Sequence, residues 1–402
     1  MDGMSARGRP AALSGRGTWR QRRRDTLTAW LFVSPSVIVI GVFGIFPLFF
    51  TLYVSLFRWR LSRGPFTGLA NYGRLFGASP AALLVVLAAV AGMVAAVALL
   101  RRVPGGSGPR TALRVTAVLL LLAALAVFAV SLPHLATQGD AAVFDALRVT
   151  VWYSLGTVPV QIVAGLLLAV LLMRPMRGRQ LFRVVALTPY IAPTVATAAI
   201  FELLFSLRPD SFANQVLKLF GGPPLQWLQE PKGILLLLFG AGAHPGPSAV
   251  AAYWAGWAQG PSLALAAIII YSWWVFIGYY ALIYMNGLAA IPRQLYEAAE
   301  VDGAGRLRSF FSITLPLLSP TTYFLTLLGV IGTFKAFTQL IVLRSAAAAG
   351  TVDPLSVSIY LTGFRTGNMG YAATIAVLLF GIVLGLTLIQ QRTSEGRVRY
   401  GD

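Results

Sequence analysis

Eight apolar segments, each long enough to cross a lipid bilayer, constrain the fold of this 402-residue chain. A membrane-spanning α-helix needs about 20 mostly apolar residues. Charged residues make up only 11% of the chain, against roughly 25% in soluble domains, so a soluble enzyme is excluded. The sequence predicts an all-α, polytopic transmembrane helical bundle of about eight spans. The segments cover about 28–57, 81–100, 112–132, 146–173, 184–206, 262–289, 317–343 and 369–391.

The net charge of +19 reflects membrane topology rather than nucleic-acid binding. The arginines form short clusters between apolar segments, and no basic stripe with interleaved aromatic residues occurs. We therefore expect no nucleic-acid partner. The chain has no cysteine and only two histidines, His134 and His244, which are predicted to lie in outer loops. A metal centre built from cysteine or histidine is therefore not expected.

The distribution of Lys and Arg predicts that both termini lie in the cytoplasm. In this orientation the inner segments hold 21 of these residues, as the positive-inside rule requires. The outer segments hold 10, and they are 58–80, 133–148, 207–261 and 344–368. The inner segments include a basic N-terminal tail, 1–27, and a C-terminal tail, 392–402. Arg58, Arg60 and two further outer arginines oppose this orientation, although the first two can snorkel to the headgroups.

Two stretches differ from the other connections. Residues 101–110 join two runs made almost wholly of Ala, Val and Leu, which predicts a lipid-facing hairpin. Residues 207–261 are rich in Gly and Pro and hold an apolar run, 234–239, that is too short to span a membrane. We expect an extracytoplasmic loop that packs on the protein.

The sequence contains no GxxxxGK[ST] phosphate loop. It also has no inverted repeat of the kind that is common in secondary transporters.

A cytoplasmic segment between the sixth and seventh apolar runs has the densest acidic cluster in the chain. Pro292 suits the first turn of a helix, and Gly303 and Gly305 suit its end. Pro316 and Pro320 then break or kink the chain as it re-enters the membrane. The pattern predicts a short helix, a turn and a second helix.

The predicted short helix suits docking to another protein. Ala298 and Ala299 leave a flat face with little side chain, which is fringed by Glu297, Glu300 and Asp302. An amphipathic helix lying on the lipid headgroups is the alternative.

The sequence EAAEVDGAGRLRSFFSITLP, 297–316, resembles the EAA loop of permease subunits of type I ABC importers. The preceding GLAAIPRQLY, with FTGLANYGRLF (66–76) and LFRVVALTPYIAP (181–193), is similar to the carbohydrate branch, which includes maltose and glycerol-3-phosphate permeases. The positions that match the loop pattern are Glu297, Ala298, Ala299, Asp302, Gly303, Ala304, Phe310, Ile313, Leu315 and Pro316.

This resemblance implies a six-helix core with an inserted hairpin. The first span and its outer loop would cover 28–76, the inserted transmembrane hairpin 77–140, and the core permease domain 141–391, with its EAA loop at 291–316. RSAAAAG, 344–350, departs from the turn that relatives often have.

The resemblance also implies a transport subunit that is not itself an enzyme, in a bacterial or archaeal inner membrane. Its partners would be a second homologous permease, two ABC ATPase subunits, an extracytoplasmic solute-binding protein, a sugar and membrane lipid. ATP and Mg would bind the ATPases, and this chain would bind no cofactor. The residues expected to couple it to the ATPases are Glu297, Ala298, Ala299, Asp302, Gly303, Ala304 and Pro316.

Polar and aromatic residues at membrane depth are candidates for contact with a sugar, because sugars need hydrogen-bonding groups and an aromatic face. Contacts between helices and anchoring at the membrane interface are alternative roles for each of them. Lys335 and Glu202 are the conspicuous intramembrane charges, which either function in transport or snorkel. The substrate-path candidates are Tyr190, Trp273, Trp274, Asn286, Thr333, Lys335 and Gln339.

Three rival functions stay open at this point. An importer of glycerol-phosphate or another polyol would need cationic groups facing its cavity. A multi-span membrane glycosyltransferase would need acidic or metal-binding residues at the membrane surface. An ion-coupled secondary transporter is disfavoured by the missing repeat and by the docking loop.

Overall fold

The computed structural model describes residues 19–60, 62–77, 80–102, 109–242, 244 and 246–394. The chain forms two compact units, Met1–Tyr53 and Val54–Asp402, and each is described by itself.

The first unit holds the first membrane-length helix. This helix consists of α1 (Trp19–Ile40), a π-helical segment (Gly41–Ile45) and α2 (Phe46–Ser55), which runs across the unit boundary. The helix begins at Trp19, before the predicted start at residue 28, so the last part of the predicted N-terminal tail is helical. Residues 1–18 of that tail lie outside the described residues.

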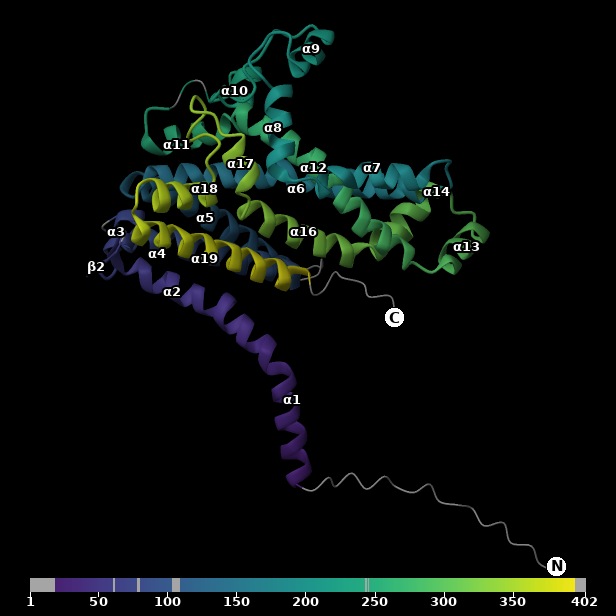
Figure 1. The fold of residues 1–402 in the computed structure, drawn as a ribbon, viewed down its shortest axis with the longest axis horizontal. Coiled ribbons are helices and arrows are strands. Elements are labelled where there is room, and N and C mark those ends of the chain that lie inside the picture. Colours follow the sequence, from purple (N-terminus) through teal and green to yellow (C-terminus); the bar gives the residue numbers. More distant parts are fainter. Residues whose placement is uncertain are drawn as a thin grey trace, which may run out of the picture. The chain divides into compact units, whose positions relative to one another are not determined.

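The centre of the second unit is formed by α6 (Ala141–Met173), α12 (Leu263–Ala289), α16 (Ser319–Phe334) and α19 (Met369–Ser394), which run side by side (Figure 1). Small residues allow α6 and α12 to pack closely, as is common between membrane helices. A Cβ atom added at Gly165 of α6 would lie 2.6 Å from the Tyr280 Cβ of α12.

Seven helices among the described residues are long and apolar enough to cross a membrane. The apolar segment predicted at 184–206 is not one continuous helix: it consists of α7 (Arg179–Ile191) and α8 (Thr194–Leu204), bent by 96°. Pro193 has no amide hydrogen and disfavours helical geometry at Ala192, whose ψ is 147°. If the bent pair is one broken span, the total is the predicted eight.

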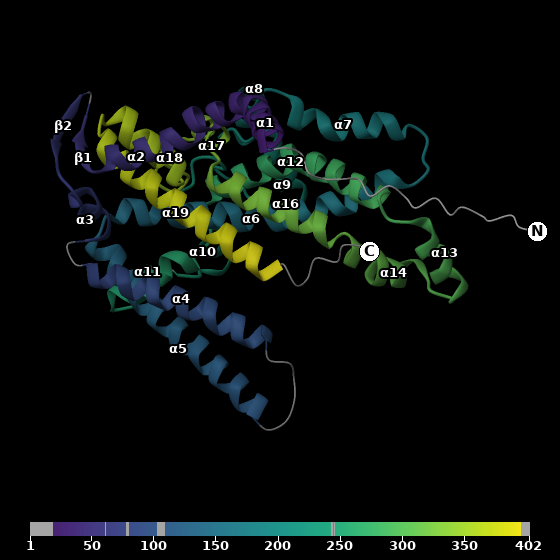
Figure 2. The same cartoon turned by 90° about the horizontal axis from the view of Figure 1, so that it is seen from below.

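The predicted hairpin consists of α4 (Pro80–Arg102) and α5 (Pro109–Gln138), which lie side by side and point away from α12 and α16 (Figure 2). The outer loop predicted at 133–148 is almost absent. Helix α5 continues to Gln138, and α6 begins at Ala141, where the Asp140 side chain accepts a hydrogen bond from the Ala142 amide. His134 therefore lies on an exposed face of α5 rather than in a loop.

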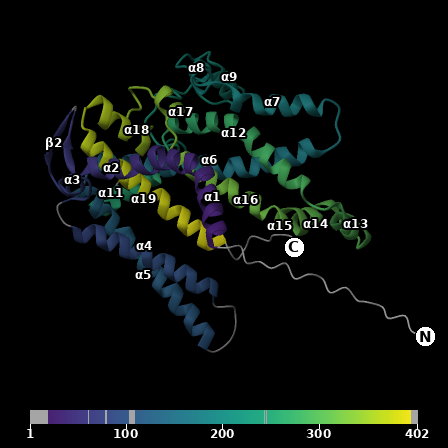
Figure 3. The ribbon, with the colours of Figure 1, turned by 60° about the horizontal axis from the view of Figure 1, so that its bottom comes forward.

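The long segment 207–261 packs on the protein, as predicted. Its apolar run forms the six-residue helix α10 (Ile234–Phe239), and α11 (Ala249–Ala258) packs against α5 (Figure 3). His244 is exposed in this segment. The third helix of the segment is α9 (Phe212–Leu219).

Short elements complete the second unit. The only strands in the described part of the chain, β1 (Phe57–Trp59) and β2 (Arg63–Phe66), form an antiparallel pair. The other short elements are α3 (Ala70–Phe76), α13 (Arg293–Val301), α14 (Arg306–Ser309), a π-helical segment (Phe310–Thr314), α15 (Leu315–Leu317), α17 (Thr338–Val342), α18 (Leu355–Tyr360) and a further π-helical segment (Leu361–Arg365).

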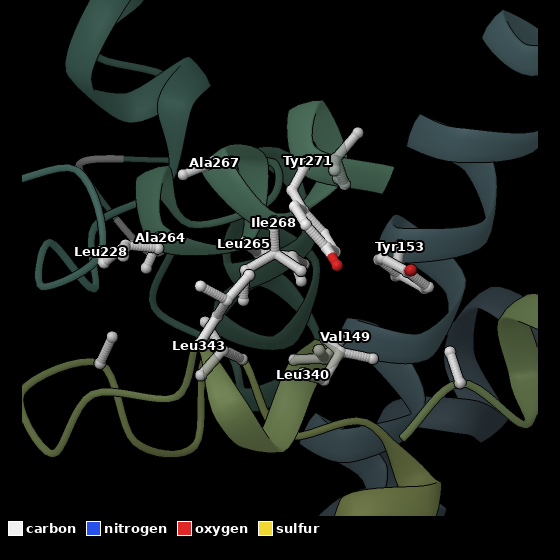
Figure 4. Packing of buried hydrophobic residues seen from close by; sticks show 14 of the residues in the cluster. Val149, Tyr153, Leu228, Ala264, Leu265, Ala267, Ile268, Tyr271, Leu340 and Leu343 are labelled. Atoms are coloured by element: carbon white, nitrogen blue, oxygen red, sulfur yellow. The ribbon is translucent and has the colours of Figure 1, made fainter. Parts of the chain in front are cut away.

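The largest hydrophobic core joins α6, α12 and α17 (Figure 4). Ile268 of α12 and Leu340 of α17 are completely buried there. Two tyrosines in this core, Tyr153 and Tyr271, carry hydroxyl groups into an otherwise apolar region (Figure 4). Buried hydroxyls need hydrogen-bond partners, so these side chains introduce polar contacts at membrane depth.

Candidate functional site

The EAA segment folds as predicted into a short helix, a glycine turn and further helix. The Ala304 amide donates to the Ala299 carbonyl at 2.8 Å, and the Gly303 amide donates to the Glu300 carbonyl at 3.0 Å. These two bonds are the Schellman pattern that ends helices. Gly303 adopts φ +75°, the left-handed region that favours glycine, whereas Gly305 has φ −68°.

Helix α13 presents its acidic face to solvent and is anchored on its other face. Glu297, Glu300 and Asp302 are exposed. Tyr296 packs against the core formed by α6, α12 and α16, and its hydroxyl is 2.8 Å from the Thr314 hydroxyl. A force applied to the exposed face therefore has a direct contact path to the segment that leads into α16.

The chain returns to the membrane through irregular helix. A π-helical segment, Phe310–Thr314, precedes α15, and a single residue, Leu318, separates α15 from α16. Pro316 and Pro320 lie just after these irregularities and lack the amide hydrogens that a continuous helix would use. The break predicted from the two prolines is confirmed.

A cavity of about 210 Å³ lies between α6, α7, α12, α16 and α17. One wall is aromatic: the rings of Tyr190 and Tyr279 stack with centroids 4.4 Å apart, and Phe276 meets Tyr190 edge-on at 5.8 Å. The lining residues are Tyr153, Gln161, Tyr190, Phe276, Tyr279, Tyr280, Leu328, Gly329, Gly332, Thr333, Ala336 and Gln339.

Other lining residues belong to a set of hydrogen bonds between helices. Gln339 donates through Nε2 to the Tyr153 hydroxyl at 2.9 Å, and that hydroxyl is 2.8 Å from Ser272 Oγ. Gln161 donates through Nε2 to the Ser272 carbonyl at 3.1 Å, and Thr333 donates to Ser154 Oγ at 2.9 Å. The network joins α6, α12, α16 and α17 around the cavity.

Gln339 reaches this network because the chain is not helical between α16 and α17, so α17 places this side chain beside Tyr153. Helix α16 ends at Phe334, and α17 begins at Thr338.

The loop after α17 is held by Arg344, whose Nε and Nη2 donate to the Asp353 carboxylate at 2.7 and 3.0 Å. This hydrogen bonding raises the pKa of the Arg344 guanidinium above its usual value and so keeps the guanidinium charged.

Three of the predicted substrate-path residues, Tyr190, Thr333 and Gln339, line the cavity. The other four do not. Trp273 donates through Nε1 to the Gly156 carbonyl at 2.8 Å, which is a contact between helices, and Trp274 lines a separate apolar cavity of about 450 Å³. Asn286 and Lys335 are exposed, the latter at the end of α16. Glu202 is exposed on α8.

Sequence reasoning missed Tyr153, Gln161, Phe276, Tyr279 and Tyr280 as cavity residues. A signal for two of them was present: Tyr153 and Gln161 belong to a polar stripe along the otherwise apolar α6, spaced at three to four residues. The stripe consists of Thr150, Tyr153, Ser154, Thr157 and Gln161, all buried.

None of the side chains that line the cavity is an acid, lysine, arginine or histidine. The cavity therefore offers hydroxyl, amide and aromatic groups but no formal charge. No cluster of His, Cys, Asp and Glu able to hold a metal ion occurs in the part of the chain that the structure describes.

The membrane-length helices, with an internal cavity between them, are those of an integral membrane protein. The family described as "Binding-protein-dependent transport system inner membrane component" matches residues 161–397. The chain belongs to this family. It is accordingly an ABC-type transport subunit and not an enzyme, and its EAA loop and helical fold are those of the family.

Individual relatives agree with this assignment. The arabinooligosaccharides transport system permease protein AraP of Halalkalibacterium halodurans is 28% identical over 64% of this chain and 73% of its own length. The sn-glycerol-3-phosphate transport system permease protein UgpA of Rhizobium meliloti is 31% identical over 66% and 80%. A solved chain of a bacterial ABC transporter involved in alginate import has the same fold, with a TM-score of 0.62, 17% identity and coverage of 95% and 99%.

Proposed function

We propose that this chain is one of two permease subunits that form the sugar path of an ATP-driven, binding-protein-dependent importer. The observation that carries the proposal is the uncharged, aromatic-walled cavity between α6, α12 and α16 in a chain of this family. The relative AraP, by its name, belongs to a system that transports arabinooligosaccharides.

The cavity has the two kinds of group that sugar recognition needs. The Tyr190–Tyr279 pair offers a ring face for stacking, and Thr333 and Gln339 offer hydroxyl and amide groups to sugar hydroxyls. Tyr153 belongs to the same polar network. The second permease would supply the other half of the path.

The proposed coupling surface is α13 and the turn after it. Glu297 and Asp302 would pair with groups of an ATPase subunit, while Ala298, Ala299 and Ala304 let the two surfaces approach closely. Closure of two ATPase subunits on ATP and Mg would move α13, and the Tyr296–Thr314 contact and the Pro316 region would carry that movement into α16. The cavity would thereby switch its access from one side of the membrane to the other.

Glycerol-phosphate import is the second candidate, because UgpA belongs by its name to such a system. Proteins bind phosphate mainly through Arg, Lys and helix N-termini. The cavity lining has no cation, and Lys335 lies outside that lining. The cavity chemistry therefore favours a neutral sugar. A membrane glycosyltransferase is not favoured by the family or by the cavity.

The proposal includes an orientation and a division of the chain. Both termini would lie in the cytoplasm of a bacterium or archaeon, so that α13 faces the ATPases, and a solute-binding protein would dock on the opposite side. Residues 141–391 would be the transport core, and 77–140 an accessory hairpin. The excess of Lys and Arg in the inner segments supports this orientation.

The test is the ATPase activity of the assembled complex in lipid vesicles, with the solute-binding protein added either empty or loaded with one candidate sugar. We expect one neutral sugar to stimulate ATP hydrolysis and its own uptake. Stimulation only by glycerol-3-phosphate would overturn the neutral-sugar proposal. Failure of any ATPase subunit to bind the permease pair would overturn the coupling role of α13.

A further inference from the structure

Two segments leave the helical core and return to it close to where they left, and each is called an excursion below. At the base of the α4–α5 hairpin, a Cβ atom added at Gly77 would lie 3.0 Å from the Gln138 Cβ. At the base of the excursion that carries α10 and α11, the Ile234 amide donates to the Pro261 carbonyl at 2.9 Å. The two excursions meet where Trp254 of α11 contacts α5.

A hydrogen bond joins the two excursions where they meet, and a proline in α5 explains why it forms. Pro133 lies inside α5 and has no amide hydrogen, so the Ala129 carbonyl four residues earlier lacks its normal helical donor. The Trp254 indole Nε1 donates to that carbonyl at 2.7 Å. A side chain from one excursion therefore satisfies a backbone group that a proline in the other leaves unpaired.

Helix α11 also contacts α6 through its aromatic side chains. The Trp257 ring lies 6.4 Å from the Trp152 ring of α6. Beside Gly256, an added Cβ atom would be 2.6 Å from the Arg148 guanidinium, which pairs with Asp145. Helix α11 thus joins α5 to α6.

The depth of these contacts can be worked out along both helices. Ala129 lies 18 residues after Thr111, where the membrane-length part of α5 begins, which is a rise of about 27 Å. Trp152 lies 21 residues before Met173, the other end of α6, which is about 32 Å. Both distances match the hydrocarbon thickness of about 30 Å.

The residue types agree with that depth. Trp and Tyr concentrate at the boundary between hydrocarbon and headgroups, and α11 contains Tyr253 and both tryptophans but no charged residue. The ion pair of Arg148 and Asp145 lies one turn farther out along α6.

We propose that α11 is an interfacial clasp. It lies in the plane of the membrane, at the headgroup boundary of the leaflet opposite α13, contacts the phospholipids there and fixes the α4–α5 hairpin to α6. The proposal requires only that the chain spans a bilayer, so it stands or falls separately from the transported substrate.

Because the chain has no cysteine, single spin labels test the proposal directly. Ala251→Cys and Ala258→Cys place labels on one face of α11, because positions seven residues apart on an α-helix lie almost directly above one another. Leu120→Cys marks the exposed middle of α5, and Glu300→Cys marks solvent on α13. The full chain is reconstituted in vesicles of phosphatidylcholine and phosphatidylglycerol, and label depth is measured from relaxation by oxygen and by a nickel chelate.

Both α11 labels are expected at one depth, between those of the Leu120 and Glu300 labels. Relaxation by the nickel chelate equal to that of the Glu300 label would place α11 in water and overturn the proposal. A depth equal to that of the Leu120 label would also overturn it. If the two α11 labels differed by about 10.5 Å, the rise of seven helical residues, α11 would cross the membrane plane instead of lying in it.

Discussion

The hydrogen bond between Trp254 and Ala129 predicts a compensating pair of substitutions. Trp254→Phe keeps an aromatic ring but removes the indole N–H, so the Ala129 carbonyl loses its donor. Pro133→Ala restores a backbone amide at the position that normally serves that carbonyl. We therefore expect Trp254→Phe to be harmful in the natural chain and much less harmful when residue 133 is alanine.

The magnitude follows from the cost of leaving one polar group unpaired. A buried carbonyl without a donor costs about 1–3 kcal/mol, which is a factor of roughly 5 to 150 in an opening equilibrium. Trp254→Phe also weakens the ring contacts with Tyr253 and Trp257, at 5.4 and 6.1 Å, because the phenyl ring is smaller than the indole. That packing loss is the same whether residue 133 is Pro or Ala, so it cancels in a double-mutant cycle.

Amide hydrogen exchange of the end of α5, measured on the reconstituted chain, reports the local opening equilibrium. Trp254→Phe should speed this exchange by the factor given above, and Pro133→Ala should remove most of the increase. Trp257→Phe is the matched control, because that indole makes no hydrogen bond to α5. Equal effects of Trp254→Phe with and without Pro133 would refute the hydrogen-bond reasoning.

Three further predictions concern coupling and the cavity. Gly303→Ala should cost about 1–2 kcal/mol in the turn, from its φ of +75°, and reduce transport-coupled ATP hydrolysis, whereas Gly305→Ala, at φ −68°, should be neutral. Glu297→Lys should abolish co-purification of the ATPase subunits without changing membrane insertion. Tyr279→Leu should lower sugar-stimulated ATP hydrolysis about tenfold, as about 1.4 kcal/mol of lost stacking would, while Trp274→Leu, outside the cavity, should not.

The membrane helices were predictable because each is set by a continuous apolar run. The bend between α7 and α8 was not, because hydropathy averaged over 20 residues hardly responds to one proline at position 193. The same averaging led to the prediction of a loop at 133–148. Polar residues in this range, such as His134, lie instead on α5, which extends beyond its apolar run.

The two parts of the candidate site differ in the same way. The end of α13 was predictable because Gly303 and its neighbours fix the turn through bonds within six residues. The cavity is formed by helices distant in sequence. Trp273 and Tyr279 are both aromatic and lie on one helix, yet only Tyr279 reaches the cavity, because packing of α12 against α6 and α7 decides which face is open. The sequence of α12 alone does not show how this helix is rotated about its own axis.

Deleting the α4–α5 hairpin tests whether this part of the chain is needed for transport. Gly77 and Gln138 adjoin, so residues 78–138 can be removed and Gly77 joined to Gly139 through one or two added glycines. The contacts that position the start of α6 lie outside the deletion: the Asp140 amide donates to the Leu75 carbonyl at 3.2 Å, and the Asp140 carboxylate accepts from the Tyr371 hydroxyl at 2.7 Å.

The deletion also removes Ala129, so Trp254→Phe is included to avoid an indole N–H without an acceptor. The shortened chain should insert, assemble with its partners and keep sugar-stimulated ATP hydrolysis, because neither the cavity nor α13 draws a residue from 78–138. Gly303→Pro in the full-length chain is the contrasting variant, since it leaves the hairpin intact and should lose that stimulation. If the shortened chain inserts and assembles but hydrolyses ATP no better than the Gly303→Pro variant, the hairpin is part of the transport machinery and its accessory role is disproved.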